Sequence, residues 1–418
     1  MFGSKIKKII SVTLITVFMM LPLAGCSEDE VKKIPAAYGS YGADFARELA
    51  ASYPYRKAYS GQETAAGEMI KLELSSLGYE VEEQPFTNEE GETSRNLIVH
   101  VEGKGFMGET EEGSGEYTEI RKSVLIGAHY DSAFGADDMP EEGDYTYDGI
   151  SDNASGVGCV MTIAKRISEY QDIGFDVTIV FFGAGHDDFA GARAYYASMT
   201  PDERESTEVM YCIESIYGGD KVYANAGMNS LDLSQKYQMR RKLYQAYDVA
   251  YDSELASTNG FSLLYNESGI VTDLNEDGQN DVYREVSVNR SDYVVFDSAN
   301  IPIVFFDSGD YFFTSLDETK ETKNLNLQEF GGAIRGTLLD SSEVLDSILV
   351  TEEQDVLEIR INNIAYVILE SMLKGSDFGM THEEYEYMLA NPTEPSESEE
   401  SGESVSESTS AASSAAEG

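Results

Sequence analysis

The stretch Ile126-Gly127-Ala128-His129-Tyr130-Asp131-Ser132 decides the fold, because an apolar strand pattern ends there in a histidine and a carboxylate. A second stretch, Ser151-Asp152-Asn153-Ala154-Ser155-Gly156, precedes apolar residues spaced three and four apart, which form one face of a helix. Asp152 or Asn153 is available to cap this helix. A strand, a polar loop and a helix in this order predict one unit of an α/β fold.

Further apolar, β-branched runs predict strands that are buried on both faces of a parallel sheet. They span residues 177–182, 210–213 and 301–306, and the segments between them leave room for crossover helices. The other expected elements are a helical segment at 46–77, strands at 78–86 and 96–101, and an exposed Gly- and Glu-rich loop at 103–119.

Polar residues follow these strands where each strand ends. His129 follows the first strand, Gly185-His186-Asp187-Asp188 the second, Glu214 the third, and Asp307 and Asp310 the fourth. Ligands of open α/β sheets bind at the carboxyl ends of the strands. We therefore expect these side chains to form one site.

The formal net charge of −47 argues against nucleic acid as a partner, because phosphate contacts need clustered Lys and Arg and no such cluster is visible. Residues 376–392 form an acidic C-terminal end. The tail at 393–418 is rich in Ser, Glu and Ala and lacks aromatic residues. It cannot bury enough apolar surface to offset the entropy of ordering, so we expect a disordered, solvated spacer.

The N-terminus has the pattern of an export signal. Lys5, Lys7 and Lys8 precede an apolar segment at 9–23 that is too short for an ordinary spanning helix. The following Leu23-Ala24-Gly25-Cys26 resembles a bacterial lipobox. This resemblance implies that residues 1–25 are removed, that Cys26 carries a lipid, and that residues 26–44 link an extracytoplasmic protein to the membrane. A plain secretion signal is the alternative.

Besides Cys26, the chain holds only Cys159 and Cys212, each inside an apolar pattern. We interpret them as two small buried hydrophobic residues, with a disulfide as the alternative.

With Arg56, Ser60-Gly61, Ser291-Asp292-Tyr293 and residues 300–306, these motifs resemble the M28 family of zinc aminopeptidases and carboxypeptidases over residues 45–375. The resemblance implies an α/β fold with a mixed, mostly parallel central sheet flanked by helices. It also implies a site for two zinc ions, built from five ligands and one Glu that takes a proton from water.

Matched to the family pattern, one half of this site is complete. His129 matches the first ligand, Asp152 the carboxylate that bridges both metals, and Glu214 the ligand after the third strand. Asp131 matches the carboxylate that orients the histidine. The first metal site therefore keeps three ligands.

The other half departs from the pattern. The general base falls on Gly185, which has no proton acceptor, and a metal-binding His falls on Phe313, which cannot coordinate a metal. The second Glu falls on His186, which could still coordinate zinc. We therefore expect one zinc ion per chain, with Asp187 or Asp188 as a displaced base.

Residues 265–290 form a possible insertion with a second cation signal. Asp273, Asn275, Asp277 and Asp281 have the spacing of oxygen ligands in a calcium loop, but Arg284 stands at the twelfth position instead of Glu. The segment is either a calcium-binding loop or an acidic surface turn.

Two functions follow from these patterns. The first is an exported, lipid-anchored M28-type metallopeptidase that trims N-terminal residues from peptides with zinc-activated water, its activity impaired by Gly185 and Phe313. The second is a catalytically inactive relative that binds a peptide or protein at the cell surface.

Overall fold

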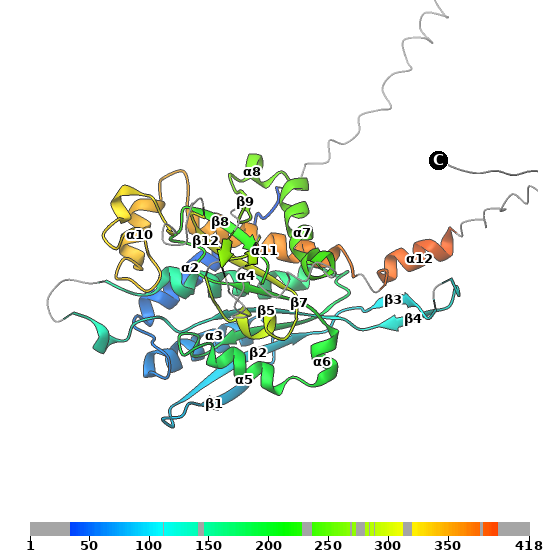
Figure 1. Ribbon diagram of the computed structural model, residues 1–418, viewed down its shortest axis with the longest axis horizontal. Helices are drawn as coiled ribbons and strands as arrows, with labels where there is room; N and C mark the ends of the chain where they lie inside the picture. The colour runs from blue at the N-terminus through cyan, green and yellow to red at the C-terminus, as the bar shows by residue number, and fades with distance from the viewer. Residues whose placement is uncertain are drawn as a thin grey trace, which may run out of the picture.

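The computed structural model describes residues 34–111, 113–140, 146–227, 236–267, 270–272, 281–283, 285–287, 289–311, 320–376 and 379–391. Its centre is an eight-stranded sheet in the order β1-β2-β6-β5-β7-β12-β8-β9 (Figure 1). The strands are β1 (Glu82–Thr87), β2 (Thr93–Val101), β5 (Ser123–His129), β6 (Asp176–Phe182), β7 (Thr207–Ile213), β8 (Lys221–Asn225), β9 (Leu263–Leu264) and β12 (Ile303–Gly309).

The sheet is mixed and its centre is parallel. Strand β5 pairs in parallel with β6 and β7, and β7 pairs in parallel with β12. The pairs β1–β2, β2–β6 and β12–β8 are antiparallel. The expected fold class, a mostly parallel sheet flanked by helices, is confirmed, and the five apolar runs after residue 95 all form strands.

Both faces of the central strands are buried, as their continuous apolar runs predict. On β5, Val124 and Ile126 face one hydrophobic core, while Leu125 faces the other. The helices that cover the sheet and its ends are α2 (Tyr41–Ser52), α3 (Gly61–Ser76), α4 (Gly156–Arg166), α5 (Ala190–Ser198), α6 (Pro201–Ser206), α7 (Lys236–Asp252), α8 (Leu255–Thr258), α9 (Tyr293–Asp297), α10 (Ser342–Leu349), α11 (Val356–Leu373) and α12 (His382–Ala390).

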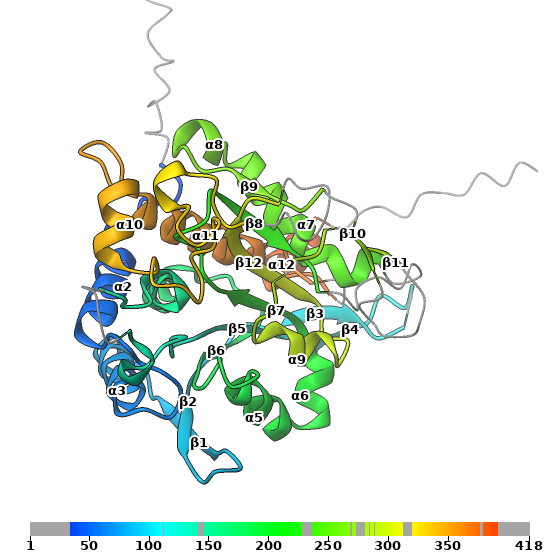
Figure 2. The ribbon, with the colours of Figure 1, turned by 60° about the vertical axis from the view of Figure 1, so that its left-hand side comes forward.

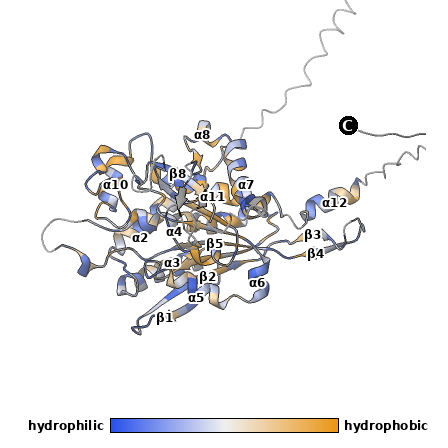
Figure 3. Cartoon of the chain, viewed as in Figure 1, coloured by the Kyte–Doolittle hydropathy of each residue, from blue (hydrophilic) through white to orange (hydrophobic). Residues whose placement is uncertain are grey.

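These helices form two layers (Figure 2). Residues of α2, α4, α7 and α11 belong to the core on one face, whereas α5 and α9 contribute Ala192 and Phe296 to the core on the other. Figure 3 shows the same division as hydropathy, with hydrophobic colour on the central strand β5 and hydrophilic colour on the outer helix α6. The sheet is therefore a rigid platform whose strand ends can hold a site.

The segment 103–119, expected as an exposed loop, instead forms part of a hairpin. Strands β3 (Phe106–Glu109) and β4 (Tyr117–Ile120) pair antiparallel and extend from one end of the molecule beside α12 (Figure 1). The rings of Tyr117 and Tyr385 lie 5.2 Å apart, and Met107 forms a bridge with Met380. The loop prediction was wrong because strands of four residues show too little alternation to stand out among Gly and Glu.

Cys159 and Cys212 are free and buried, which confirms that they are small hydrophobic core residues. A further pair, β10 (Ile270–Thr272) and β11 (Asp281–Tyr283), forms a separate two-stranded sheet. Within the described residues, no helix combines the length and apolar character that crossing a bilayer requires. Cys26 and the tail at 393–418 lie outside the described residues.

Candidate metal centre

His129 ends strand β5 and presents its ring to three carboxylates. The side chain is almost fully buried. Its Nδ1 lies 3.1 Å from Asp131 Oδ1, while its Nε2 lies 3.3 Å from Asp152 Oδ1 and 3.6 Å from Glu214 Oε2. The Asp131 contact fixes the ring orientation, so Nε2 is the atom directed at the other two acids.

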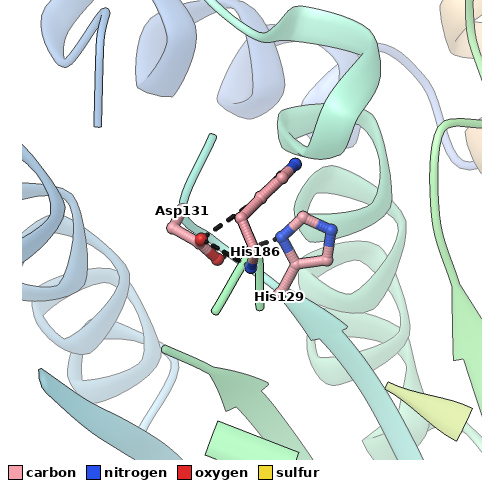
Figure 4. Close-up of side chains that lie close together, drawn as sticks. All are labelled: His129, Asp131 and His186. Atoms are coloured by element: carbon pink, nitrogen blue, oxygen red, sulfur yellow. Dashed lines mark hydrogen bonds and ion pairs between the residues drawn. The ribbon is translucent and has the colours of Figure 1, made fainter. Parts of the chain in front are cut away.

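The Asp131 carboxylate is shared by two histidines, as Figure 4 shows. Oδ1 contacts His129 Nδ1 and accepts a hydrogen bond from the backbone N–H of Gly185 at 2.7 Å. Oδ2 accepts from the backbone N–H of His186 at 3.0 Å and lies 3.2 Å from His186 Nδ1. One buried carboxylate therefore orients both imidazoles and also holds the loop after β6.

Asp152 faces the same two histidines from the opposite side. Its Oδ2 lies 3.2 Å from His186 Nε2, and its Oδ1 is buried and makes no hydrogen bond. Asp131, His129, Asp152 and His186 thus form a closed ring of alternating acids and imidazoles. The two imidazole rings lie 5.0 Å apart, edge to face.

The backbone that carries Asp152 is fixed by Asp340. The carboxylate of Asp340 accepts hydrogen bonds from the N–H groups of Ser151 at 2.7 Å and Asp152 at 3.0 Å. On the other side, Asn153 Oδ1 accepts from the N–H groups of Gly156 and Ser215. The start of α4 is therefore tied to the loop after β7. The helix begins at Gly156 with Ser155 at its N-cap position, two or three residues later than the cap expected from the sequence.

Glu214 follows β7 and is buried. Its backbone N–H bonds to Phe306 O at 3.0 Å, which continues the parallel pairing of β7 with β12. Glu214 Oε1 lies 2.9 Å from Arg335 Nη1, whereas Oε2 is the oxygen nearest to His129. The two oxygens of this carboxylate thus have separate partners.

Burial and mutual charge shift the pKa values of the whole group. Burial opposes ionisation of Asp131 and Asp152, but the two histidines outweigh it and hold the pKa of each acid below its usual range. Burial likewise opposes the charged form of His186, yet the charge of Asp152 and the Asp131 contact raise its pKa to about 10. For Glu214, burial opposes ionisation, but the charge of Arg335 and the His129 contact together outweigh it and lower the pKa.

The donor set fits a zinc ion. Ligand atoms of His129, Asp152 and Glu214 all lie within 4.8 Å of one another. Histidine nitrogen and carboxylate oxygen are both zinc ligands, and catalytic sites use three protein ligands with the fourth position left to water or substrate. The buried Asp152 Oδ1 lacks a hydrogen-bonding partner, which a metal would supply. Ligand atoms of His129, Asp131 and His186 form a second close group.

The structure does not bring the expected displaced bases to this centre. The Asp187 carboxylate accepts a hydrogen bond from the Tyr59 hydroxyl at 2.6 Å, and Asp188 forms an ion pair with Arg193 on the surface. Among the described interactions, neither acid contacts His129, Asp152 or Glu214. The expectation placed them here by sequence distance alone, but the chain turns outward directly after His186.

Gly185 leaves no room for a side chain. A Cβ atom at this position would lie 2.6 Å from both Cβ and Cγ of His129. The neighbouring Ala184 N–H bonds to Glu63 Oε1 at 2.8 Å, so this loop is held from two sides by Glu63 and Asp131. The backbone path of this loop therefore leaves no space for a glutamate base at position 185.

Other expected residues lie apart from the centre or outside the described residues. Asp307 Oδ2 accepts hydrogen bonds from Ser287, Asn289 and Tyr311, and Asp310 pairs with lysines. Phe313, Asp273, Asn275 and Asp277 lie outside the described residues, as does the side chain of Asp281, so the calcium loop stays a prediction.

Several residues at the centre were not expected from the sequence. Asp340 and Arg335 come from a segment without periodic pattern, so no local signal marks them. Glu63 belongs to a Ser60-x-x-Glu63 pattern, which predicts a helix cap but not its bond to the site loop. Asp292 belongs to a motif that the sequence matched to the family, but no role was expected for it: it is fully buried, neither carboxylate oxygen bonds to a described residue, and burial raises its pKa to about 7.

Comparison with known proteins agrees with the zinc-type site that the geometry describes. Residues 109–338, more than half of the chain, match Peptidase family M28. The alkaline phosphatase isozyme conversion protein of Escherichia coli (strain K12) is 20% identical over 317 residues, which cover 74% of this chain and 84% of that protein.

Two solved structures share the fold at low identity. BSAP, a zinc aminopeptidase from Bacillus subtilis, has a TM-score of 0.54 at 12% identity, covering 84% of this chain and 99% of that one. A glutaminyl cyclase from an Acidobacteriales bacterium also has a TM-score of 0.54 at 12% identity, covering 85% of this chain and all of that one. Together with the match over residues 109–338, the fold and the strand-end residues show that this chain belongs to peptidase family M28.

Proposed function

We propose that this protein is an exported, lipid-anchored metallopeptidase that removes N-terminal residues from peptides at a single zinc ion. The observation that carries the proposal is the convergence of His129 Nε2, Asp152 Oδ1 and Glu214 Oε2 on one point. Export and the lipid are inferred from the lipobox-like Leu23-Ala24-Gly25-Cys26. The charge of −47 keeps nucleic acid out of the proposed partners.

Zinc bound by these three residues would polarise the scissile carbonyl and lower the pKa of a water molecule. Such a water would release its proton to solvent, so the proton that the chain itself must supply is the one that the leaving amine takes up. His186 is the residue that geometry favours, since Asp131 holds its Nδ1 side and its Nε2 lies beside Asp152 Oδ2. Its side chain is 28% exposed, so substrate can reach it. Because both of its ring nitrogens face carboxylates, His186 carries a proton, and we therefore propose it, instead of Asp187, as the group that donates a proton to the leaving amine.

A second function is favoured by Gly185. A Cβ there would overlap His129, so the loop cannot accept a glutamate base without moving the ligand. Loss of a positioned base typically costs about 10²- to 10⁴-fold in rate. A chain that has lost this base can retain the fold and the metal as a peptide- or protein-binding surface protein.

The experiment measures zinc per chain and peptide hydrolysis together. Protein lacking residues 1–26 is purified without chelators or metal affinity resin, and its zinc content and turnover of aminoacyl-nitroanilides are determined. His129→Ala should abolish both. His100→Ala, which removes an exposed histidine on β2, is the matched control and should change neither.

The outcomes separate the two functions. About one zinc per chain with turnover that depends on His129 and His186 supports the peptidase. Zinc without turnover on any substrate of the panel supports the binding protein. Absence of zinc from the purified chain, and no uptake on addition, would refute the metal site itself.

A further inference from the structure

The Arg335 guanidinium lies beside the metal ligand Glu214 and has one nitrogen without a partner. Nη1 pairs with Glu214 Oε1 at 2.9 Å, and Nε donates to Ser215 Oγ at 3.1 Å. Nη2 is buried, yet it makes no hydrogen bond to any described residue. A buried donor left unpaired is costly, and such a group in a native protein calls for an explanation, of which a catalytic role is one.

Arg335 is held rigidly at both ends. Its backbone N–H and that of Ile334 both donate to Glu321 Oε2, at 2.7 and 2.5 Å. At the other end, Ser215 is fixed because its N–H bonds to Asn153 Oδ1 and its carbonyl accepts from Ser308. The direction of Nη2 is therefore set by the fold before any ligand arrives, which is the condition for a preorganised donor.

Zinc binding would make the surroundings of this guanidinium less negative. Zinc at the proposed site would offset the two negative charges of Asp152 and Glu214. The carboxylate of Glu214 would then join the metal through Oε2 and the guanidinium through Oε1. Arg335 would then stand as a positive charge beside Glu214, with the buried acids Glu321 and Asp307 also near it.

The family pattern explains why such a charge would be needed. The resemblance implies two metal ions, but the second set of ligands is altered at His186 and Phe313. With one zinc, the reacting carbonyl would lack a second positive group. A fixed guanidinium can supply that charge, because arginine keeps its proton in proteins and offers several donors in a plane.

We propose that Arg335 is a catalytic residue whose Nη2 binds the substrate oxygen on which negative charge develops when the peptide carbonyl is attacked. The ligand class is thus an oxyanion of an N-terminal aminoacyl group. This inference rests on the proposed peptidase function and adds to it the residue that takes over from the second metal ion.

The test uses the phosphonic acid analogue of leucine, a tetrahedral anion, as the probe. Its affinity is measured by calorimetry for zinc-loaded and zinc-free protein, alongside kcat and KM for leucyl-nitroanilide. Arg335→Met should lower kcat by about 10²- to 10³-fold, the range found for loss of one oxyanion donor. It should weaken phosphonate binding at least tenfold and leave KM within about threefold and zinc near one per chain.

Two further variants control for charge and for folding. Arg335→Lys keeps a positive charge but loses the planar set of donors of the guanidinium. We therefore expect its kcat and phosphonate affinity to lie between those of Arg335→Met and wild type. If Arg335→Met does not fold, as judged by circular dichroism, Arg335→Lys carries the test and should still bind the probe more weakly than wild type. Arg166→Met removes a comparably exposed arginine, paired with Glu169 at 2.6 Å, and should match wild type.

Failure of this inference is distinguishable from failure of the proposed function. If wild type holds zinc and turns over substrate, but Arg335→Met retains wild-type kcat and phosphonate affinity, only the role of Arg335 is refuted. If wild type holds no zinc and has no turnover, the peptidase proposal fails. In that case phosphonate binding to the metal-free chain that is lost in Arg335→Met still supports an oxyanion site, and its absence overturns it.

Discussion

Replacing Asp131 by Asn should weaken zinc binding, although Asp131 is not one of the three proposed ligands. The carboxylate has four donors around it, namely His129 Nδ1, His186 Nδ1 and the backbone N–H groups of Gly185 and His186. Asparagine has one oxygen, which can serve the His129 and Gly185 side. Its NH₂ group would then face the His186 side, where the backbone N–H is also a donor.

The magnitude follows from these contacts. Loss of an orienting partner of a metal-binding histidine typically costs about 10- to 100-fold in metal affinity. That range equals about 1.4–2.7 kcal/mol in zinc binding. In addition, a buried N–H of the loop loses its acceptor, which costs about 1–3 kcal/mol in stability. We therefore expect weaker zinc binding and a lower free energy of unfolding in the metal-free protein.

The assay is competition for zinc with a chelating dye, combined with urea denaturation of the metal-free proteins. Asp137→Asn is the matched control, because Asp137 is exposed and lies in the same segment after β5. A zinc dissociation constant for Asp131→Asn within twofold of wild type would refute the view that this carboxylate orients the ligands.

Three further predictions concern the residues around the centre. Gly185→Ala should destabilise the fold by about 1–3 kcal/mol in urea denaturation, because its Cβ would overlap His129, whereas Gly61→Ala has open space and should be neutral; equal stability of the two variants would contradict this. Burial, and then the charge of Asp131, raise the pKa of Glu63 from 4.5 to about 7, so the folded protein retains a proton that the unfolded chain releases. Stability should therefore fall by on the order of 3 kcal/mol as pH rises from about 4.5 to 7, and Glu63→Gln should remove most of that fall; an unchanged pH dependence would count against it. Arg56→Met should lower the free energy of unfolding by about 3–5 kcal/mol, because the buried guanidinium donates to Tyr130 O, Asp148 O and Gly149 O; a loss below about 1 kcal/mol in urea denaturation would contradict its structural role.

The sequence alone was enough to predict the site residues at the ends of the parallel strands. His129 ends β5, Glu214 comes directly after β7, and His186 lies four residues after β6; neighbouring parallel strands end at the same edge of the sheet. Their convergence could therefore be predicted from three apolar runs and the residues that follow them. Continuous apolar runs also predicted correctly that both faces of these strands are buried.

Sequence reasoning failed where the contact depends on the path of a loop. Asp187 stands one residue after His186, yet its carboxylate is bound by Tyr59, which is 128 residues away. Asp340 and Arg335 reach the centre from segments that have no period and no recognised motif. Their contributions depend on backbone direction and on single hydrogen bonds, which composition and spacing do not encode.

The support of Asp152 by Asp340 has a consequence for the order in which the protein matures. The N–H groups of Ser151 and Asp152 are held by a residue almost 190 positions later in the chain. During synthesis, His129, Asp152 and Glu214 all emerge before the segment that fixes this turn. A nascent chain that ends before Asp340 would thus carry every proposed ligand without the turn that aligns them. Metal capture would then be one of the last events of folding, and a chain that crosses a membrane unfolded would acquire its metal on the far side.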